Sequence, residues 1–325
     1  MFRKLFNTLL STITRLKSLV IQSIVILAAA TLAQATSPKT IAIIQIIEHP
    51  ALNATRQGII DTLQKKYPNI KILWESAQGS PALANQICQN FIGQSADVIV
   101  ALGTTAAQAA VCVTTQNEKS SIPVIFTSVT DPQSANIANK SCGVSNYIDV
   151  EKQVTMMRQI LPNLKTLGMI YNPGEPFTEK VLKLTQEACT KEGITLVTSA
   201  APKTSDVGTA TMAIVDKVDA LFINNDNTAL AAFPVIVKIC DGEKKPVFAS
   251  DVDVIEQGAL AVLGPDQYKI GVQTAQLVDN ALENTIFIRE SVLNGTTICY
   301  PNCIETVVNE AQAKKLNINI NKVTK

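Results

Sequence analysis

The chain has 325 residues, of which 46% are hydrophobic and 17% are charged. This length suits about two domains, and the spread of apolar residues along it excludes a disordered chain. Without the four cations of the first 35 residues, 24 basic residues stand against 27 acidic ones. Because a mildly acidic chain lacks the basic stripe that binds phosphates, we expect no nucleic-acid partner.

The first 35 residues have the order of a secretory signal peptide. Residues 1–17 are basic and free of acids, and residues 19–33 are apolar apart from Gln22, Ser23 and Thr31. Residues 33–35 (AQA) then have the small-x-small pattern that signal peptidase recognises. The apolar stretch is shorter than the ~20 residues of a membrane-spanning helix, so a cleaved signal is preferred over an anchor. We therefore expect export to a bacterial periplasm, with cleavage after Ala35.

Cysteine and histidine usage argues against a metal site. The chain has seven cysteines, a single histidine (His49) and no CxxC pair. These residues do not make up an ordinary zinc site, so we expect no metal and no cofactor. Cys299 and Cys303 are spaced so that a disulfide would close a small loop. Burial as free thiols is the alternative for all seven.

From residue 40 onward, short β-branched runs alternate with amphipathic stretches of helical period. The expected strands are 40–47, 70–75, 97–102, 123–127, 166–171, 194–198, 219–223 and 246–249. The expected helices include 51–66, 81–92, 104–115, 151–161, 177–191 and 228–240. This alternation indicates an α/β fold in which helices cover both faces of a parallel sheet.

The order of elements repeats within the chain. Residues 97–104 (DVIVALGT) correspond to residues 219–226 (DALFINND), and residues 123–127 (PVIFT) correspond to residues 246–250 (PVFAS). We therefore expect two similar lobes of about 110 residues each. Because ligands bind beyond the carboxyl ends of parallel strands, two such lobes can face each other across a cleft.

Small, polar or acidic residues follow the predicted strands. The segments are 48–50 (EHP), 103–105 (GTT), 128–132 (SVTDP), 171–175 (YNPGE), 224–227 (NNDN) and 250–253 (SDVD). They contain no Lys or Arg, and the chain has no Gly-rich phosphate motif, which argues against a phosphate ligand. A helix start at Thr104 can accept a carboxylate, and the acids can pair with an ammonium group, so the set favours an amino acid. Helix capping is the alternative role for each of these residues.

The sequence has no recognisable catalytic motif. It lacks a GxSxG elbow and a Cys–His pair at a known spacing. His49 stands in a Glu-His-Pro turn with no nucleophile motif beside it. We therefore expect a binding protein with no catalytic residues rather than an enzyme, and a secreted hydrolase is the least favoured alternative.

Several segments resemble one family of transport proteins. They are IAIIQIIEHPALNATRQGIIDTL, AQGSPALANQI, VALGTTAAQAA, PVIFTSVTDP, GVSNYIDV, GMIYNPGEP, NNDNTAL and PVFASDVDVIEQGALA. Together they closely resemble the ABC-transporter substrate-binding family that includes tryptophan- and tyrosine-binding members. The resemblance implies a type I periplasmic-binding architecture, in which two α/β lobes, each a parallel sheet flanked by helices, hold a ligand in the cleft between them.

The resemblance also implies a set of ligand-binding residues at the strand ends. One wall of the cleft would consist of Glu48, His49, Thr104, Thr105, Thr127 and Asp131, with Asn146 at the first crossover between the lobes. The other wall would consist of Asn172, Glu175, Asp226, Asn227, Ser250 and Asp251. The ligand would be a small molecule resembling an amino acid, and its aromatic character rests on the resemblance alone.

The lobes would interleave along the chain. By resemblance, residues 36–146 and about 264–292 form lobe 1, and residues 147–263 and about 293–325 form lobe 2. The protein would be a periplasmic monomer that delivers its ligand to an ABC permease and its ATPase. A receptor subunit that senses the ligand and signals to a membrane protein is the alternative that the sequence leaves open.

Overall fold

The computed structural model describes residues 38–117, 122–283, 291 and 297–320. The expected signal peptide, residues 1–35 with cleavage after Ala35, lies outside the described residues. Within the described ranges, no helix combines the length and the apolar character needed to cross a membrane. The compact unit that contains both sheets begins at Thr40.

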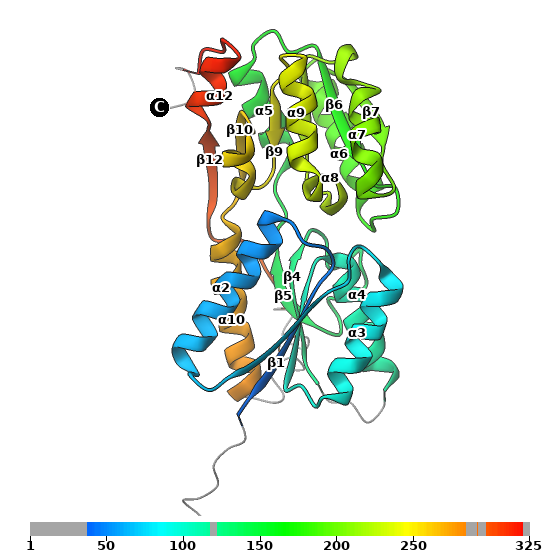
Figure 1. The fold of residues 1–325 in the computed structure, drawn as a ribbon, viewed down its shortest axis with the longest axis vertical. Coiled ribbons are helices and arrows are strands. Elements are labelled where there is room, and N and C mark those ends of the chain that lie inside the picture. Colours follow the sequence, from blue (N-terminus) through cyan, green and yellow to red (C-terminus); the bar gives the residue numbers. More distant parts are fainter. Residues whose placement is uncertain (1–37, 118–121, 284–290, 292–296, 321–325) are drawn as a thin grey trace, which may run out of the picture. The chain divides into compact units, whose positions relative to one another are not determined.

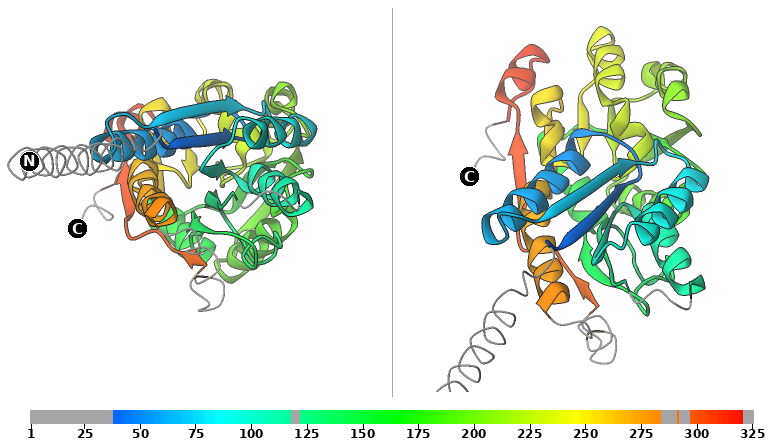
Figure 2. Two further views of the ribbon diagram at one scale, coloured as in Figure 1. Left: turned by 90° about the horizontal axis from the view of Figure 1, so that it is seen from below. Right: turned by 60° about the horizontal axis from the view of Figure 1, so that its bottom comes forward.

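The first lobe is built on a parallel sheet of order β11-β5-β4-β3-β1-β2. Its strands are β1 (Thr40–Gln45), β2 (Lys71–Ser76), β3 (Val98–Leu102), β4 (Val124–Val129), β5 (Cys142–Ser145) and β11 (Ile298–Cys299). Helices α2 (Pro50–Lys66) and α10 (Gln267–Glu283) cover one face, and α3 (Pro81–Gly93) and α4 (Thr104–Gln116) cover the other (Figures 1 and 2). Because both faces are covered, β3 is fully buried.

The second lobe repeats this plan in a sheet of order β12-β10-β9-β8-β6-β7. Its strands are β6 (Thr166–Tyr171), β7 (Thr195–Ala200), β8 (Ala220–Ile223), β9 (Val247–Ala249), β10 (Ala261–Pro265) and the antiparallel β12 (Ile304–Val308). Its helices are α5 (Val150–Ile160), α6 (Thr178–Lys191), α7 (Val207–Met212), α8 (Asn227–Ala231), α9 (Phe233–Gly242) and α12 (Glu310–Lys315), with 3₁₀ turns η1 (Thr204–Asp206), η2 (Val215–Lys217) and η3 (Val252–Gln257). Alternate residues of β8 enter opposite core layers. Ala220 and Phe222 pack with α5 and α6, and Leu221 and Ile223 pack with α7 and α9.

The predicted repeat is visible in hydrogen bonds at equivalent positions. Asp97 precedes β3, and its Oδ2 accepts the Thr40 N–H at 2.7 Å while its own N–H donates to the Thr40 carbonyl at 2.8 Å. Asp219 precedes β8 and makes the same two bonds with Thr166, at 2.8 and 2.9 Å. The prediction of two similar α/β lobes with parallel sheets is therefore confirmed.

In the described residues the chain passes from one sheet to the other between β5 and α5, between β10 and α10, and between β11 and β12. Helix α10 accordingly packs against α2 of the first lobe. The last passage comes after Cys299, which pairs with Val144 in the first sheet. Strand β11 of the first sheet is very short, and no apolar run in the sequence announces it.

The helix predicted over residues 228–240 is two helices in the structure. Helix α8 ends at Ala231, and α9 begins at Phe233. Pro234 is the second residue of α9, and proline has no N–H to donate to the preceding turn. In a continuous helix the ring of Pro234 would also clash with a carbonyl one turn earlier, so a new helix begins at this point.

Helices α2 and α10 meet at glycines. A Cβ on Gly58 would lie 2.2 Å from the carbonyl oxygen of Tyr268, and a Cβ on Gly271 would lie 2.1 Å from that of Thr55. No side chain fits at either position, so the two backbones are in direct contact. This contact holds a helix from late in the chain against one from its beginning.

All seven cysteines are free thiols. Four of them are buried, and burial raises their pKa to about 11 or 12; they are Cys88, Cys142, Cys189 and Cys240. The loop-closing disulfide between Cys299 and Cys303 is not formed. The Cys303 Sγ instead lies 3.2 Å from Lys269 Nζ and donates to Glu305 Oε1 at 3.2 Å.

Candidate ligand-binding site

The site lies where the strand order reverses in each sheet. In the first sheet β1 lies between β2 and β3, and in the second β6 lies between β7 and β8. The connections that follow β1 and β3 run to opposite faces of the first sheet, and those that follow β6 and β8 run to opposite faces of the second. This divergence opens a crevice at the carboxyl ends of the strands. Thr104 follows β3 at this edge, Glu175 follows β6, and Asp226 follows β8.

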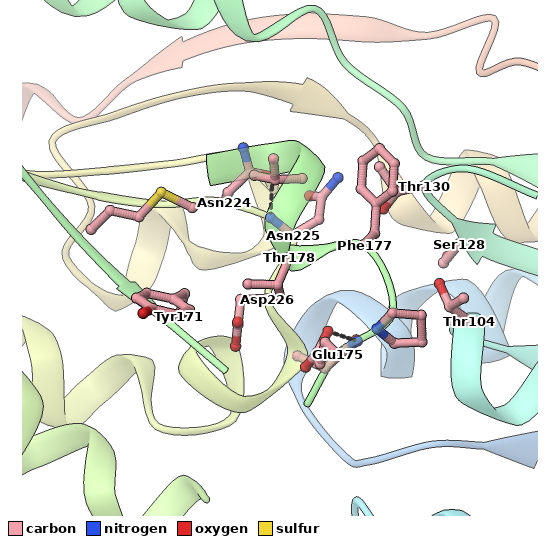
Figure 3. Close-up of a pocket in the computed structure, with 14 residues that line it drawn as sticks. Thr104, Ser128, Thr130, Tyr171, Glu175, Phe177, Thr178, Asn224, Asn225 and Asp226 are labelled. Atoms are coloured by element: carbon pink, nitrogen blue, oxygen red, sulfur yellow. Dashed lines mark hydrogen bonds between the residues drawn. The ribbon is translucent and has the colours of Figure 1, made fainter. Parts of the chain in front are cut away.

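A pocket at this edge is lined by both lobes (Figure 3). The first lobe contributes Thr104, Ser128 and Thr130. The second lobe contributes Met169, Tyr171, Glu175, Pro176, Phe177, Thr178, Val181, Asn224, Asn225, Asp226 and Asn227. The pocket has a volume of about 30 Å³, which is room for one or two water molecules. A larger ligand therefore requires the lobes or the lining side chains to move.

Four of the predicted site residues line the pocket, namely Thr104, Glu175, Asp226 and Asn227. Thr104 owes its place to Gly103, whose φ of 91° turns the chain from β3 directly into α4. A Cβ at Gly103 would lie 2.7 Å from Ile46 Cγ2, so glycine is required there. The first residue of α4 is thereby directed at the pocket.

Asp226 is held by two backbone N–H groups. It caps α8, with its Oδ1 accepting from Ala229 N at 2.9 Å, and its Oδ2 accepts from Asn172 N at 2.6 Å. Capping, the alternative proposed from the sequence, is therefore one of its roles. Its charge still faces the pocket, since Asp226 is among the lining residues.

Glu175 lies close enough to Asp226 for the two charges to repel. Its Oε2 accepts from Asn227 Nδ2 at 2.9 Å, and its Oε1 accepts from Thr228 N at 3.2 Å. Burial raises the pKa of both carboxyls, and the charge of Asp226 raises the pKa of Glu175 further. Among the described residues that line the pocket there is no Lys or Arg to offset this charge.

His49 connects the two lobes. It is 4% exposed and caps α2, where its Nδ1 accepts from Leu52 N at 3.5 Å. The proton is then on Nε2, which donates to Asn227 Oδ1 at 3.2 Å. The Nδ2 of Asn227 in turn donates a hydrogen bond to Glu175. Burial lowers the pKa of His49 to about 4 despite the opposing effect of the hydrogen bond that it donates to Asn227, so the ring is neutral near pH 7.

Asp131 and Asn146 make further contacts between the lobes without lining the pocket. Asp131 forms an ion pair with Lys180 of α6 at 2.5 Å. Burial by itself would raise the pKa of Asp131, but hydrogen bonds from Lys180 and Ser134 outweigh it and lower the pKa to about 2. The Asn146 carbonyl accepts from Asn225 Nδ2 at 3.2 Å.

Thr127 and Ser250 point into the lobes that carry them. Thr127 is fully buried and accepts a hydrogen bond from Thr274 of α10 at 2.8 Å. Ser250 is also fully buried and accepts from Gln153 of α5 at 3.1 Å. Neither residue lines the pocket, so the structure does not bring them to the candidate site.

The remaining predicted residues are not among those that line the pocket. Asp251 is 1% exposed and accepts a hydrogen bond from Gln267 at the start of α10. Asn172 turns its side chain to the backbone and side chains of its own lobe. Glu48 is exposed, and Thr105 is the second residue of α4.

Several lining residues were not selected from the sequence. Ser128, Thr130, Tyr171, Asn224 and Asn225 stand in the predicted strand-end segments, so position alone could have identified them. Met169, Pro176, Phe177, Thr178 and Val181 carry no polar strand-end signal. Met169 and Tyr171 alternate along β6, so both face the same side of the sheet.

The lining combines an acidic part, hydroxyl and amide groups, and an apolar part. The apolar part comprises Met169, Tyr171, Phe177 and Val181. In the part of the chain that the structure describes, no group of His, Cys, Asp and Glu side chains is arranged to hold a metal ion. The pocket can thus pair a positive charge with carboxylates and cover apolar surface.

Two α/β lobes that together line one pocket are the architecture of a two-lobed binding protein. The model of the ABC transporter substrate binding protein family matches residues 40–324, and the chain belongs to this family. It is 30% identical over 256 residues to a tyrosine-binding protein of Clostridioides difficile, an alignment that covers 75% of this chain and 73% of the relative.

Solved structures support the same assignment. A conserved domain protein from Vibrio cholerae is 36% identical, with a TM-score of 0.79 and coverage of 87% of this chain and 96% of that one. A domain from Streptococcus pneumoniae in complex with L-Trp is 26% identical, with the same TM-score and coverage. A periplasmic solute binding protein from Actinobacillus succinogenes, 19% identical with a TM-score of 0.61, shares the fold.

Proposed function

We propose that the protein binds an aromatic amino acid between its lobes and delivers it to an ABC importer. The observation that carries this proposal is the pair of half-buried Glu175 and buried Asp226, which has no cation among the lining residues. A buried charge without a partner is costly, and a ligand ammonium group would relieve that cost in both carboxylates at once.

The opposite side of the pocket suits the ligand carboxylate. Thr104 is the first residue of α4, and the free N–H groups and dipole of a helix start favour an anion. Ser128 and Thr130 also line this side (Figure 3). An ammonium group at Glu175 and a carboxylate at Thr104 describe a zwitterion held between the lobes.

The apolar part of the lining would receive the ligand side chain. Tyr171 and Phe177 offer aromatic rings, which bind other rings favourably in stacked or edge-to-face geometry. The tyrosine-binding relative and the L-Trp complex support an aromatic side chain here.

The family to which the chain belongs supports a role in transport rather than in sensing. In this proposal residues 1–35 direct export and are removed, and the periplasmic monomer docks on an ABC permease driven by its ATPase. Binding without catalysis is proposed because His49 is neutral and its ring nitrogens contact Leu52 and Asn227, not a nucleophile.

Calorimetry with ligand analogues tests the proposal. L-tryptophan and L-tyrosine should bind, whereas tryptamine, which lacks the carboxylate, and indole-3-propionate, which lacks the ammonium group, should bind at least about tenfold more weakly. Mass spectrometry of ligand that co-purifies with the protein identifies the natural ligand. Indole-3-propionate binding as tightly as L-tryptophan would contradict the role of the two carboxylates.

A further inference from the structure

One buried side chain at the second passage between the sheets joins both lobes to the pocket. Gln267 is the first residue of α10, directly after β10 and Asp266, and it is 1% exposed. Its Oε1 accepts from Thr55 Oγ1 at 3.0 Å and from Ser128 Oγ at 3.2 Å, both in the first lobe. Its Nε2 donates to Asp251, which follows β9 in the second lobe.

Ser128 gives this connection a direct route to the ligand. It lines the pocket, and its φ of 53° places it in the left-handed region that a non-glycine residue seldom adopts. The pairing of β4 with β5 shifts register between Thr127 and Val129, which is the point at which Ser128 turns out of the strand. Ser128 thus lines the pocket and also donates its hydroxyl proton to Gln267.

We propose that Gln267 is a positioning residue that fixes the orientation of the lobes and transmits it to the pocket through Ser128. The proposal deepens the proposed function and rests on it for the ligand. It also gives Asp251, predicted as a ligand contact, a different role, which is to anchor the second lobe to the first turn of α10.

The chemistry of the carboxamide explains why glutamine suits this place. The hydroxyls of Thr55 and Ser128 offer protons to the Gln267 oxygen, and the Asp251 carboxylate accepts from the Gln267 nitrogen. A glutamine side chain offers both from one rigid group, whereas glutamate offers acceptors alone.

Exchanging the carboxamide of Gln267 and the carboxylate of Asp251 tests the connection that Gln267 makes between the lobes. In Q267E the new carboxylate keeps the contacts to Thr55 and Ser128 but faces Asp251, so affinity for L-tryptophan should fall by about tenfold or more. D251N retains an acceptor for Gln267 and should stay within about threefold of the parent protein. The double variant Q267E/D251N restores a donor opposite an acceptor and should recover to within about threefold.

The control is Q276E, the same substitution at an exposed position of α10, which should leave affinity unchanged. Equal losses in Q267E and in the double variant would contradict the proposal, and so would a Q267E protein that binds like the parent. If Q267E does not fold, the double variant decides: a folded, binding double variant supports the connection, and one that fails to fold or bind overturns it.

Solution scattering without ligand separates this proposal from the proposed function. If the parent protein binds neither L-tryptophan nor L-tyrosine, the proposed function fails. Q267E should even then differ in radius of gyration from the parent, and the double variant should return to the parent value. Identical radii in all three proteins would overturn the proposal.

Discussion

Replacing Glu175 with glutamine should move stability and ligand affinity in opposite directions. Burial and the charge of Asp226 raise the pKa of Glu175 in the folded protein, so the folded state binds this proton more tightly than the unfolded state. Stability is therefore lost as the pH rises through that raised pKa. E175Q removes this loss and should unfold at a higher temperature than the parent protein at pH 7.5.

Ligand affinity should fall in the same variant. Removing one partner of a buried charge pair costs about 2–4 kcal/mol, or roughly 30- to 1,000-fold in Kd. Glu175 is the preferred target, since both Asp226 oxygens accept backbone N–H groups, whereas one of the two Glu175 oxygens accepts from the side-chain amide of Asn227. In the parent protein, affinity should also rise with pH as Glu175 loses its proton.

Calorimetry with L-tryptophan and thermal unfolding measure the two effects, with E179Q as the control. Glu179 is exposed in the first turn of α6, so the same loss of charge there should leave affinity unchanged. A variant E175Q that binds within about threefold of the parent would refute the assignment of the ammonium site. A variant that loses stability and affinity together would show that Glu175 is structural.

Three further substitutions probe other contacts. H49N keeps a good helix cap but removes a group whose pKa burial lowers from 6.5 to about 4, so acid unfolding curves should lose the fall in stability of about 3 kcal/mol between those pH values. G58A should lower the free energy of unfolding in denaturant titrations by about 1–3 kcal/mol or more, because its Cβ meets the backbone of α10, whereas G93A, with open space around it, should change it little. K180Q removes a half-exposed ion pair with Asp131, so calorimetry should show at most about fivefold weaker binding, an effect that added salt reduces. A tenfold effect of K180Q that persists in high salt would contradict this reading of the contact.

The sequence was sufficient for the alternating elements and for the regions that form the pocket, because buried parallel strands are continuous apolar runs whose ends are easily located. It was not sufficient for the choice of side chains at those ends. Thr127 and Ser128 are neighbours, yet the first packs against α10 and the second lines the pocket. A shift of one residue exchanges the two faces of a strand, and the left-handed turn at Ser128 has no signature in an isolated sequence.

The apolar part of the pocket was missed for a different reason. Phe177 and Val181 come from the beginning of α6, where an apolar residue indicates a core face as readily as a binding surface. The short strand β5 was missed because its four residues, Cys142–Ser145, have no β-branched run. In both cases packing between distant segments of the chain determines whether a residue lines the pocket or belongs to a strand, and the local sequence pattern does not.

The late position of α10 bears on the order in which the chain becomes structured as it is synthesised. The first lobe lacks both α10 and β11 until residues beyond Gln267 are available, by which point five strands of the second sheet have been made. The stretch from Val150 to Pro265, by contrast, is continuous and contains those five strands with their helices. An emerging chain can therefore assemble its second lobe first, while the apolar face of α2 is not yet covered by α10. The face of the first sheet that α10 covers is therefore completed only after Glu283 has been made.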